Sequence, residues 1–181
     1  VARLGQGPTK RPGTWDYGVD YDDMMRRIMR HYDETEDPRD VILLVQLRNG
    51  SRISEAIEAV LEMARSGRRE VYVRVEKQRA ARLRLMVMPE GLRQSDVERA
   101  ARYVQERYAS QRSARVSLWE YARRTYGINT HSLRYALVTK LARQGVPAQL
   151  IARVTGHRKL DYILTYTQQQ AAEELLRKLG G

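Results

Sequence analysis

Hydrophobic side chains change their spacing at one place in this chain, between residues 70 and 88. The segments EVYVRV (70–75) and RLRLMVM (82–88) alternate in twos around a short polar connection. This alternation predicts the two strands of a β-hairpin, with Lys77 just past the first strand. On both sides of the hairpin, apolar side chains recur at the three- and four-residue spacing of an α-helix. We therefore expect a mainly α-helical fold with one small antiparallel β-hairpin.

Three helices are predicted before the hairpin. The first begins near Asp20, and the second opens at Asp37-Pro38 and ends at Asn49-Gly50. Ser51 is expected to cap the third helix, which ends at Gly67. Serine side chains accept hydrogen bonds from the unpaired N–H groups at a helix start, and glycine readily adopts the left-handed conformation that ends a helix.

Five helices are predicted after the hairpin. The capping-box patterns Ser95-x-x-Glu98 and Ser117-x-x-Glu120 indicate two helix starts, and Gly127 ends the second of these helices. Asn129 or Thr130 is expected to cap the next helix, which ends at Gly145. The remaining two cover residues 147–156 and the segment from about residue 159 to the end.

We expect one folded domain over residues 20–181, which is long enough to bury a core without disulfides. Residues 1–19 are basic and rich in glycine and proline without apolar periodicity, a composition typical of an arm or linker.

The charge balance is strongly basic, because 33 Lys and Arg residues stand against 22 Asp and Glu residues and give a net charge of +11. Such a surface favours a polyanionic partner, and nucleic acid fits better than a membrane. No apolar run reaches the 18 or so residues of a membrane-spanning helix and no signal-peptide pattern opens the chain, so we expect a cytoplasmic protein without membrane contacts. The absence of cysteine excludes disulfides, thiolate metal sites and cysteine nucleophiles.

Two pairs of residues have spacings that suit phosphate binding. His131 and Arg134 are three apart in the first turn of a predicted helix, so they share one face near the positive end of the helix dipole. Arg52 precedes Glu55 by three positions, which allows the carboxylate to orient the guanidinium. Each pair taken alone fits an ordinary solvent-exposed helix start better than a phosphate site.

A histidine and two tyrosines lie close together in the segment TGHRKLDYILTYT (155–167). His157 and Tyr166 are nine residues apart, which would place them on opposite faces of one unbroken helix, so they can share a site only if the chain bends between them. Tyr162 and Tyr166 are four apart and are expected to point the same way. Helical spacing therefore does not distinguish a reactive tyrosine from one that packs in the core.

Taken together and in their order along the chain, these motifs resemble those of the tyrosine recombinases. This integrase family includes Xer-type enzymes, phage integrases and integrases of archaeal mobile elements. The resemblance covers residues 20–180. The arginine box of the family, G-x-R-x-S-E, is matched by Gly50–Glu55, and its strand-associated lysine by Lys77. Its H-x-x-R box is matched by His131–Arg134, and its G-H box with a tyrosine nine residues later by Gly156-His157 and Tyr166. The resemblance implies the fold of a tyrosine recombinase catalytic domain.

The resemblance also implies site-specific DNA recombination through a 3′-phosphotyrosine intermediate, without a metal or nucleotide cofactor. Tyr166 would be the nucleophile, whereas Tyr162 stands where the family usually carries a small polar residue. The other implied roles are phosphate binding for Arg52 and Arg134, general acid for Lys77, acid or base for His131, hydrogen-bond donor to the phosphate for His157, and orientation of the site for Glu55. The implied partners are double-stranded DNA, contacted also by Arg79, Arg158 and Lys159, and a homotetramer assembled on it.

The sequence departs from the family pattern in two places. The connection from Lys77 to Pro89 is longer than usual, so Arg79 and Arg82 are candidates to replace the charge of Lys77, though not its proton transfer. The N-terminal core-binding domain that most relatives use to encircle DNA is expected to be absent.

Two other functions remain open at this point. A type IB topoisomerase would use similar chemistry but rejoin the original strand. A non-catalytic DNA-binding module is the other alternative, because residues 146–167 also fit a helix-turn-helix with Arg158 and Lys159 at the start of its recognition helix. That alternative leaves Arg52, Lys77 and His131 without a role.

Overall fold

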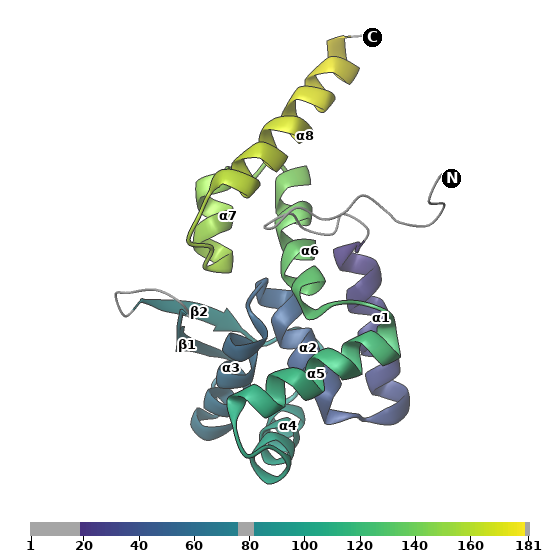
Figure 1. Cartoon of the computed structure of the whole chain (residues 1–181), viewed down its shortest axis with the longest axis vertical. Coiled ribbons are helices and arrows are strands. Elements are labelled where there is room, and N and C mark those ends of the chain that lie inside the picture. Colours follow the sequence, from purple (N-terminus) through teal and green to yellow (C-terminus); the bar gives the residue numbers. More distant parts are fainter. Residues whose placement is uncertain (1–18, 76–81, 180–181) are drawn as a thin grey trace, which may run out of the picture.

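The computed structural model describes residues 19–75 and 82–179. Within this part, the chain forms eight α-helices and a two-stranded antiparallel sheet (Figure 1). The elements in chain order are α1 (Tyr21–Thr35), α2 (Pro38–Asn49), α3 (Ile53–Ser66), β1 (Glu70–Arg74), β2 (Leu83–Val87), α4 (Gln94–Arg107), α5 (Gln111–Tyr126), α6 (Thr130–Arg143), α7 (Ala148–Thr155) and α8 (Asp161–Leu179). The mainly helical fold with one hairpin is confirmed. The strands pair with Val73 opposite Arg84.

Helix α2 is the centre of the main core. Its segment ILLVQL is apolar on nearly every side, and its residues 41–45 are fully buried. A helix that is apolar all round has to be covered on all sides, and α2 packs against α1, α3, α4 and α6. This arrangement fixes the end of α2, at Asn49 and Gly50, beside the starts of α3 and α6.

The end signals of several helices are confirmed. Asp20 caps α1 by accepting a hydrogen bond from the backbone N–H of Asp23, and Asp37 caps α2 in the same way. Asn129 caps α6. Gly50 ends α2 with φ +57°, and a Cβ at this position would lie 2.9 Å from the side chains of Leu137 and Thr155. Glycine is therefore needed there both for its conformation and for the close approach of α6 and α7.

The predicted cap at Ser51 is wrong. The residue that precedes α3 is Arg52, whose backbone N–H donates to the Glu55 carboxylate. The hydroxyl of Ser51 donates instead to the Arg52 carbonyl oxygen. A carboxylate at the third helical position satisfies the first backbone donor without a serine cap.

Both capping-box predictions after the hairpin are also wrong. Helix α4 begins before Ser95, with the Arg93 N–H donating to Asp96. Helix α5 begins at Gln111 behind a Ser110 cap, so Ser117 lies inside this helix, where its hydroxyl is hydrogen-bonded to the Tyr108 hydroxyl. The same three-residue spacing occurs along any helix face, and this is why the pattern misplaced both starts.

Helices α6, α7 and α8 form a second, smaller apolar cluster that includes Val138, Ile151, Ile163 and Tyr166. Beyond this cluster α8 projects away from the body (Figure 1). Leu175, Leu176 and Leu179 on the projecting part are exposed.

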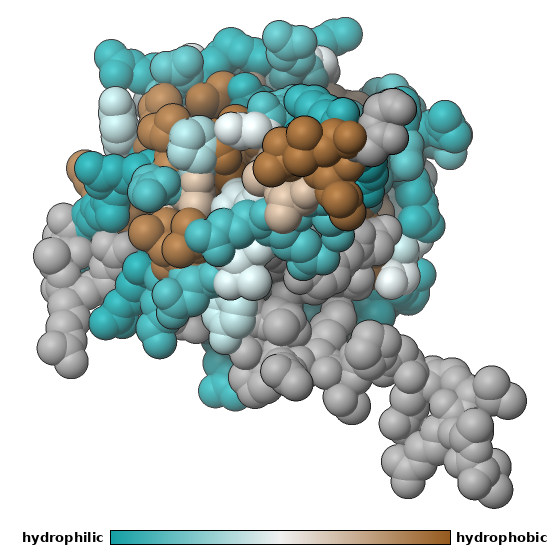
Figure 2. Space-filling model, turned by 90° about the horizontal axis from the view of Figure 1, so that it is seen from above, coloured by the Kyte–Doolittle hydropathy of each residue, from teal (hydrophilic) through white to brown (hydrophobic). Residues whose placement is uncertain are grey.

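Seen from above, the surface shows hydrophobic patches among mostly hydrophilic residues (Figure 2). None of the helices in the described part is long and apolar enough to span a membrane.

Candidate active site

Arg52 and Arg134 come from different parts of the chain and meet at the turn that follows α7. Arg134, in the first turns of α6, donates from Nη1 to the carbonyl oxygens of Gly50 at 3.0 Å and Thr155 at 2.6 Å. Arg52 donates from Nη1 to the carbonyl oxygen of Gly156 at 3.5 Å. The end of α2, the start of α6 and the end of α7 therefore bring both guanidiniums to one place.

Glu55 is the carboxylate shared by this group. It is 1% exposed and accepts a hydrogen bond from Arg52 Nη1 at 3.0 Å and one from Arg84 Nη1 at 3.3 Å. Three guanidiniums, those of Arg52, Arg84 and Arg134, thus stand beside one carboxylate. A buried excess of positive charge is costly unless an anion neutralises it, so this arrangement suits an anionic ligand.

Arg84 is the residue that sequence reasoning missed. It lies on β2 and is 5% exposed. Its guanidinium donates to Glu55, to the carbonyl oxygens of Val154 and Thr155 at the end of α7, and to that of Asn49 at the end of α2. The carbonyl groups at helix ends lack partners within the helix, and the five donors of a guanidinium can satisfy several at once. One signal was available, because Arg84 shares its strand face with the methionines of RLRLMVM.

Burial and repulsion among the guanidiniums lower the pKa values of two arginines in this cluster. Burial, followed by the charge of Arg52, lowers the pKa of Arg134 to about 9, although Glu55 opposes the shift. Burial also lowers the pKa of Arg84. Arg134 stays charged near neutral pH, and a bound anion would raise the pKa of both arginines by attracting the charged form.

His157 lies in the turn between α7 and α8, directly after Gly156 at φ +74°. Its Nδ1 atom is 2.6 Å from the Thr155 hydroxyl oxygen, and its ring centroid is 6.1 Å from that of Tyr135. Burial, then the charges of Arg134, Arg52 and Arg84, lower the pKa of His157 to about 2. The imidazole is therefore neutral in the free protein at physiological pH.

His131 lies at the exposed start of α6 and lines a groove of about 540 Å³ together with Arg52. Helix α5 forms the other wall of this groove with Arg112, Arg115 and Trp119, residues that the sequence motifs did not indicate. The groove connects one of the clustered guanidiniums with the protein surface.

The two tyrosines differ sharply in burial. Tyr166 is 4% exposed and packs in the cluster of α6, α7 and α8, whereas Tyr162 is 42% exposed. Both tyrosines lie in α8, four residues apart, but their surroundings differ although their positions on the helix are close. Residues four apart differ by about 40° around a helix, and here that difference spans the border of the buried face. Helix α7 ends at Thr155 and α8 begins at Asp161, so the chain does bend between His157 and Tyr166.

Five further basic residues were named from the sequence, and the structure describes three of them. Lys77 and Arg79 lie outside the described residues. Arg82 is described, and its carbonyl oxygen accepts from the Val75 N–H at 2.7 Å. Arg158 and Lys159 are exposed in the turn before α8. They do not start a recognition helix, because α8 begins two residues later at Asp161.

The sequence pattern of the phage integrase family matches residues 21–173. The chain belongs to the phage integrase family. This integrase-family chain is 38% identical to a candidate integrase, ORF241 of Acidianus two-tailed virus, over 98% of its own length and 73% of that protein. It is 32% identical to the uncharacterised protein MJ0770 of Methanocaldococcus jannaschii, over 99% of its own length and 95% of that protein.

Among solved structures, the crystal structure of XerA recombinase resembles the integrase-family chain with a TM-score of 0.55 and 16% identity. The match covers 95% of this chain and 67% of XerA. At this level of identity the likeness establishes a common fold. The tyrosine recombinase catalytic-domain fold expected from the sequence is thereby confirmed.

Proposed function

We propose that this integrase-family protein cleaves and rejoins DNA strands at specific sites through a 3′-phosphotyrosine intermediate on Tyr166. The observation that carries the proposal is the convergence of Arg52, Arg134 and neutral His157 at the end of α7, where Arg52 is also held by the buried carboxylate of Glu55. Two guanidiniums at one point suit a phosphodiester, because their planar donors match two phosphate oxygens.

In the proposed reaction the Tyr166 oxygen attacks a DNA phosphorus atom. A bond forms from this oxygen to phosphorus and the bond to the 5′-oxygen breaks, which gives a 3′-phosphotyrosine and a 5′-hydroxyl. Lys77 would protonate the leaving 5′-oxygen, and His131 would accept the tyrosine proton. Attack by a 5′-hydroxyl of another strand reverses these steps and joins new partners. Arg52 and Arg134 would stabilise the added charge of the transition state.

Tyr166 is covered in the free protein, and this has a consequence for the mechanism. At 4% exposure within an apolar cluster, its side chain offers little surface to a phosphodiester. We expect binding of DNA to shift α8 relative to α6 and α7, so that the tyrosine oxygen becomes accessible. Hydrogen exchange over residues 161–170 should accelerate when DNA binds, and unchanged protection in a cleavage-competent complex would contradict this step.

The proposed partners are duplex DNA, with Arg79, Arg158 and Lys159 among its contacts, and further copies of the chain. The net charge of +11 supports DNA binding.

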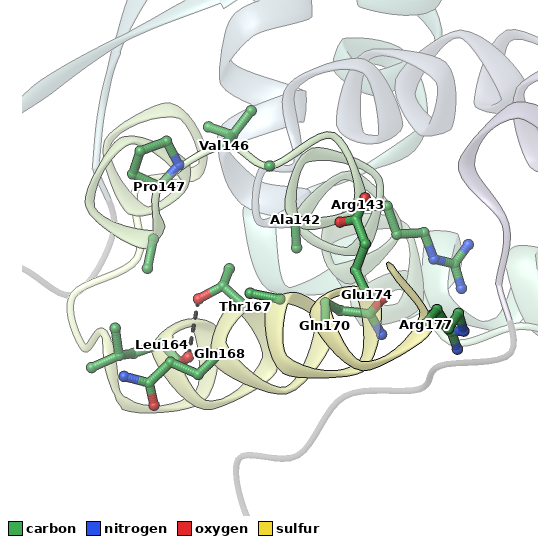
Figure 3. Close-up of a pocket in the computed structure, with 13 residues that line it drawn as sticks. Ala142, Arg143, Val146, Pro147, Leu164, Thr167, Gln168, Gln170, Glu174 and Arg177 are labelled. Carbon is green, nitrogen blue, oxygen red and sulfur yellow. Dashed lines mark hydrogen bonds between the residues drawn. The ribbon is translucent and has the colours of Figure 1, made fainter. Parts of the chain in front are cut away.

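A homotetramer on DNA is proposed because strand exchange needs four active sites. The projecting part of α8 offers three exposed leucines to a neighbour. A groove of about 500 Å³ between α8 and the junction of α6 with α7, lined by apolar and polar side chains, is a candidate surface to receive them (Figure 3). The reaction would take place in the cytoplasm.

A covalent-capture experiment tests the proposal. The protein is incubated with a pool of nicked duplexes of randomised sequence, in which the cleaved strand loses a short fragment and the adduct accumulates. A covalent protein–DNA adduct supports the proposal, and sequencing the captured DNA gives the target site. Absence of an adduct across the pool, alongside normal DNA binding, would favour a non-catalytic DNA-binding module.

The captured target then separates a recombinase from a type IB topoisomerase. A recombinase joins the cleaved strand to the 5′-hydroxyl of a second duplex, whereas a topoisomerase only reseals the original strand and relaxes supercoils. We expect joined products between two labelled target duplexes. Relaxation without any exchange product would contradict the recombinase assignment.

A further inference from the structure

Thr155 connects several residues of the candidate site. It is fully buried, and its carbonyl oxygen accepts from both Arg84 and Arg134. Its hydroxyl oxygen lies 2.8 Å from the Ile151 carbonyl oxygen and 2.6 Å from His157 Nδ1. Its methyl group packs against the position where a Cβ of Gly50 would lie.

The hydroxyl has one proton but two neighbours that can accept it, the Ile151 carbonyl oxygen and an unprotonated His157 Nδ1. If the proton is donated to Ile151, then Nδ1 must carry a hydrogen and donate it to the Thr155 oxygen. This arrangement makes two hydrogen bonds. If the proton is donated to Nδ1, only that hydrogen bond forms, and the imidazole proton lies on Nε2.

The imidazole is neutral, so only one of its two nitrogens carries a proton at a time. Arg134, Arg52 and Arg84 surround it with positive charge, and together with burial they lower its pKa. In the free protein, the arrangement with two hydrogen bonds places the proton on Nδ1 and leaves a lone pair on Nε2. Phosphate oxygens are acceptors, so this form of His157 cannot donate to a phosphate from Nε2.

We infer that the Thr155 hydroxyl controls which nitrogen of His157 carries the proton, holding it on Nδ1 in the free protein and allowing it onto Nε2 when a phosphate binds. Thr155 is thus a positioning residue that acts through His157. The second half of this inference rests on the proposed function, because it takes the bound group to be a DNA phosphate.

The change needs no backbone movement. The Thr155 hydroxyl rotates from Ile151 to Nδ1, the Nδ1 proton leaves to solvent and a proton from solvent binds Nε2, so the number of protons is unchanged. The hydrogen bond lost at Ile151 is replaced by one from Nε2 to a charged oxygen, which is the stronger type. A ligand that bonds to only one of two forms shifts the population towards that form.

The test compares wild-type protein with Thr155→Val and Thr155→Ser. Valine removes the hydroxyl but keeps the branched shape that packs against Gly50, and serine keeps the hydroxyl. The measurement is the ¹⁵N chemical shift of both imidazole nitrogens of His157. The chain has three histidines, so His131→Gln completes the assignment, and the His31 signals report on the fold.

We expect the Nδ1–H signature in wild-type protein and in Thr155→Ser, and a shift of the proton towards Nε2 in Thr155→Val, because Nδ1 loses its partner. An Nε2–H signature in wild-type protein, or an unchanged signature in Thr155→Val, would overturn the inference. If Thr155→Val does not fold, Thr155→Ala against Thr155→Ser makes the same comparison.

Adduct formation on the captured DNA target is the second measurement. We expect Thr155→Val to form the adduct at least about tenfold more slowly, because the ring is no longer held, and Thr155→Ser to stay near the wild-type rate. An undiminished rate in Thr155→Val would remove Thr155 from the positioning of His157. If wild-type protein forms no adduct, the proposed function fails. The ¹⁵N chemical shifts of His157 still decide whether Thr155 controls the position of the imidazole proton.

Discussion

Arg84 and Arg134 donate to the same oxygen atom, the carbonyl oxygen of Thr155, each at 2.6 Å. One guanidinium reaches it from strand β2 and the other from helix α6, so the end of α7 is held from two sides. The position of His157, two residues further along, therefore depends on both arginines.

Arg84 is expected to stabilise the fold strongly. Arg84→Met should lower the free energy of unfolding by about 3 kcal/mol, because it removes a partner of buried Glu55 and leaves the helix-end carbonyl groups unpaired. Arg84→Lys should recover only part of this loss, since an ammonium lacks the planar fork. Urea unfolding measures the effect. The exposed Arg74→Met on β1 is the matched control and should change stability by less than about 0.5 kcal/mol. An Arg84→Met protein as stable as wild type would contradict the role of Arg84.

His157 should make the protein less stable in mild acid. Its pKa falls from 6.5 to about 2 on folding, so between these values the unfolded chain binds a proton that the folded chain does not. The free energy of unfolding should therefore decrease as the pH falls below 6.5, by at most about 1.4 kcal/mol per pH unit from this residue. Urea unfolding gives the free energy of unfolding of wild-type and His157→Gln proteins between pH 7 and pH 4. The difference between the two proteins at each pH isolates the contribution of His157. A difference that does not change with pH would show that His157 is not held neutral.

Arg134 should be essential for strand cleavage. Arg134→Ala is expected to slow adduct formation by at least about 10²-fold, the usual cost of losing a donor to a developing charge. Arg134→Lys should restore little, because lysine cannot reach two oxygens in the fixed geometry of a guanidinium. Circular dichroism and DNA affinity establish that each variant is folded and binds. Wild-type rates in the lysine variant would exclude Arg134 from the site.

DNA binding should weaken steeply as salt is added. A surface of net charge +11 displaces condensed counterions from the duplex, so the logarithm of the association constant should fall linearly with the logarithm of the salt concentration. Fluorescence anisotropy with labelled duplexes measures the slope. An affinity that hardly changes between 50 mM and 200 mM salt would argue against a basic binding face.

The order of helices and the single hairpin were predictable, because they depend on periodicity within each segment. The orientation of the hairpin was not. The segment RLRLMVM places leucines on one face and Arg84 with methionines on the other, and the structure exposes Leu83 and Leu85. The face with Arg84 is buried because three distant segments supply oxygen atoms for its guanidinium. Such partners are not visible in a local pattern.

The candidate site was predictable as a set of residues but not as an arrangement. The motif order led to Arg52, Arg134 and His157, which the structure brings to one turn. The role of Thr155 depends on a single hydroxyl between two acceptors, which no spacing rule reveals. The different burial of Tyr162 and Tyr166 depends on where the packed face of α8 ends, and that border is set by α6 and α7.

The central claim is that Tyr166 is the residue that attacks the DNA phosphate. The mass of the DNA-linked peptide tests this claim most directly. Wild-type protein and the variants Tyr166→Phe and Tyr162→Phe are captured on the nicked target, digested and mapped by mass spectrometry. Each variant removes one oxygen atom from an aromatic side chain of nearly unchanged shape, so DNA binding should persist in both. We predict a nucleotide adduct on Tyr166 in wild-type protein and in Tyr162→Phe, and none in Tyr166→Phe. An adduct on Tyr162, or full cleavage by Tyr166→Phe, would contradict the account.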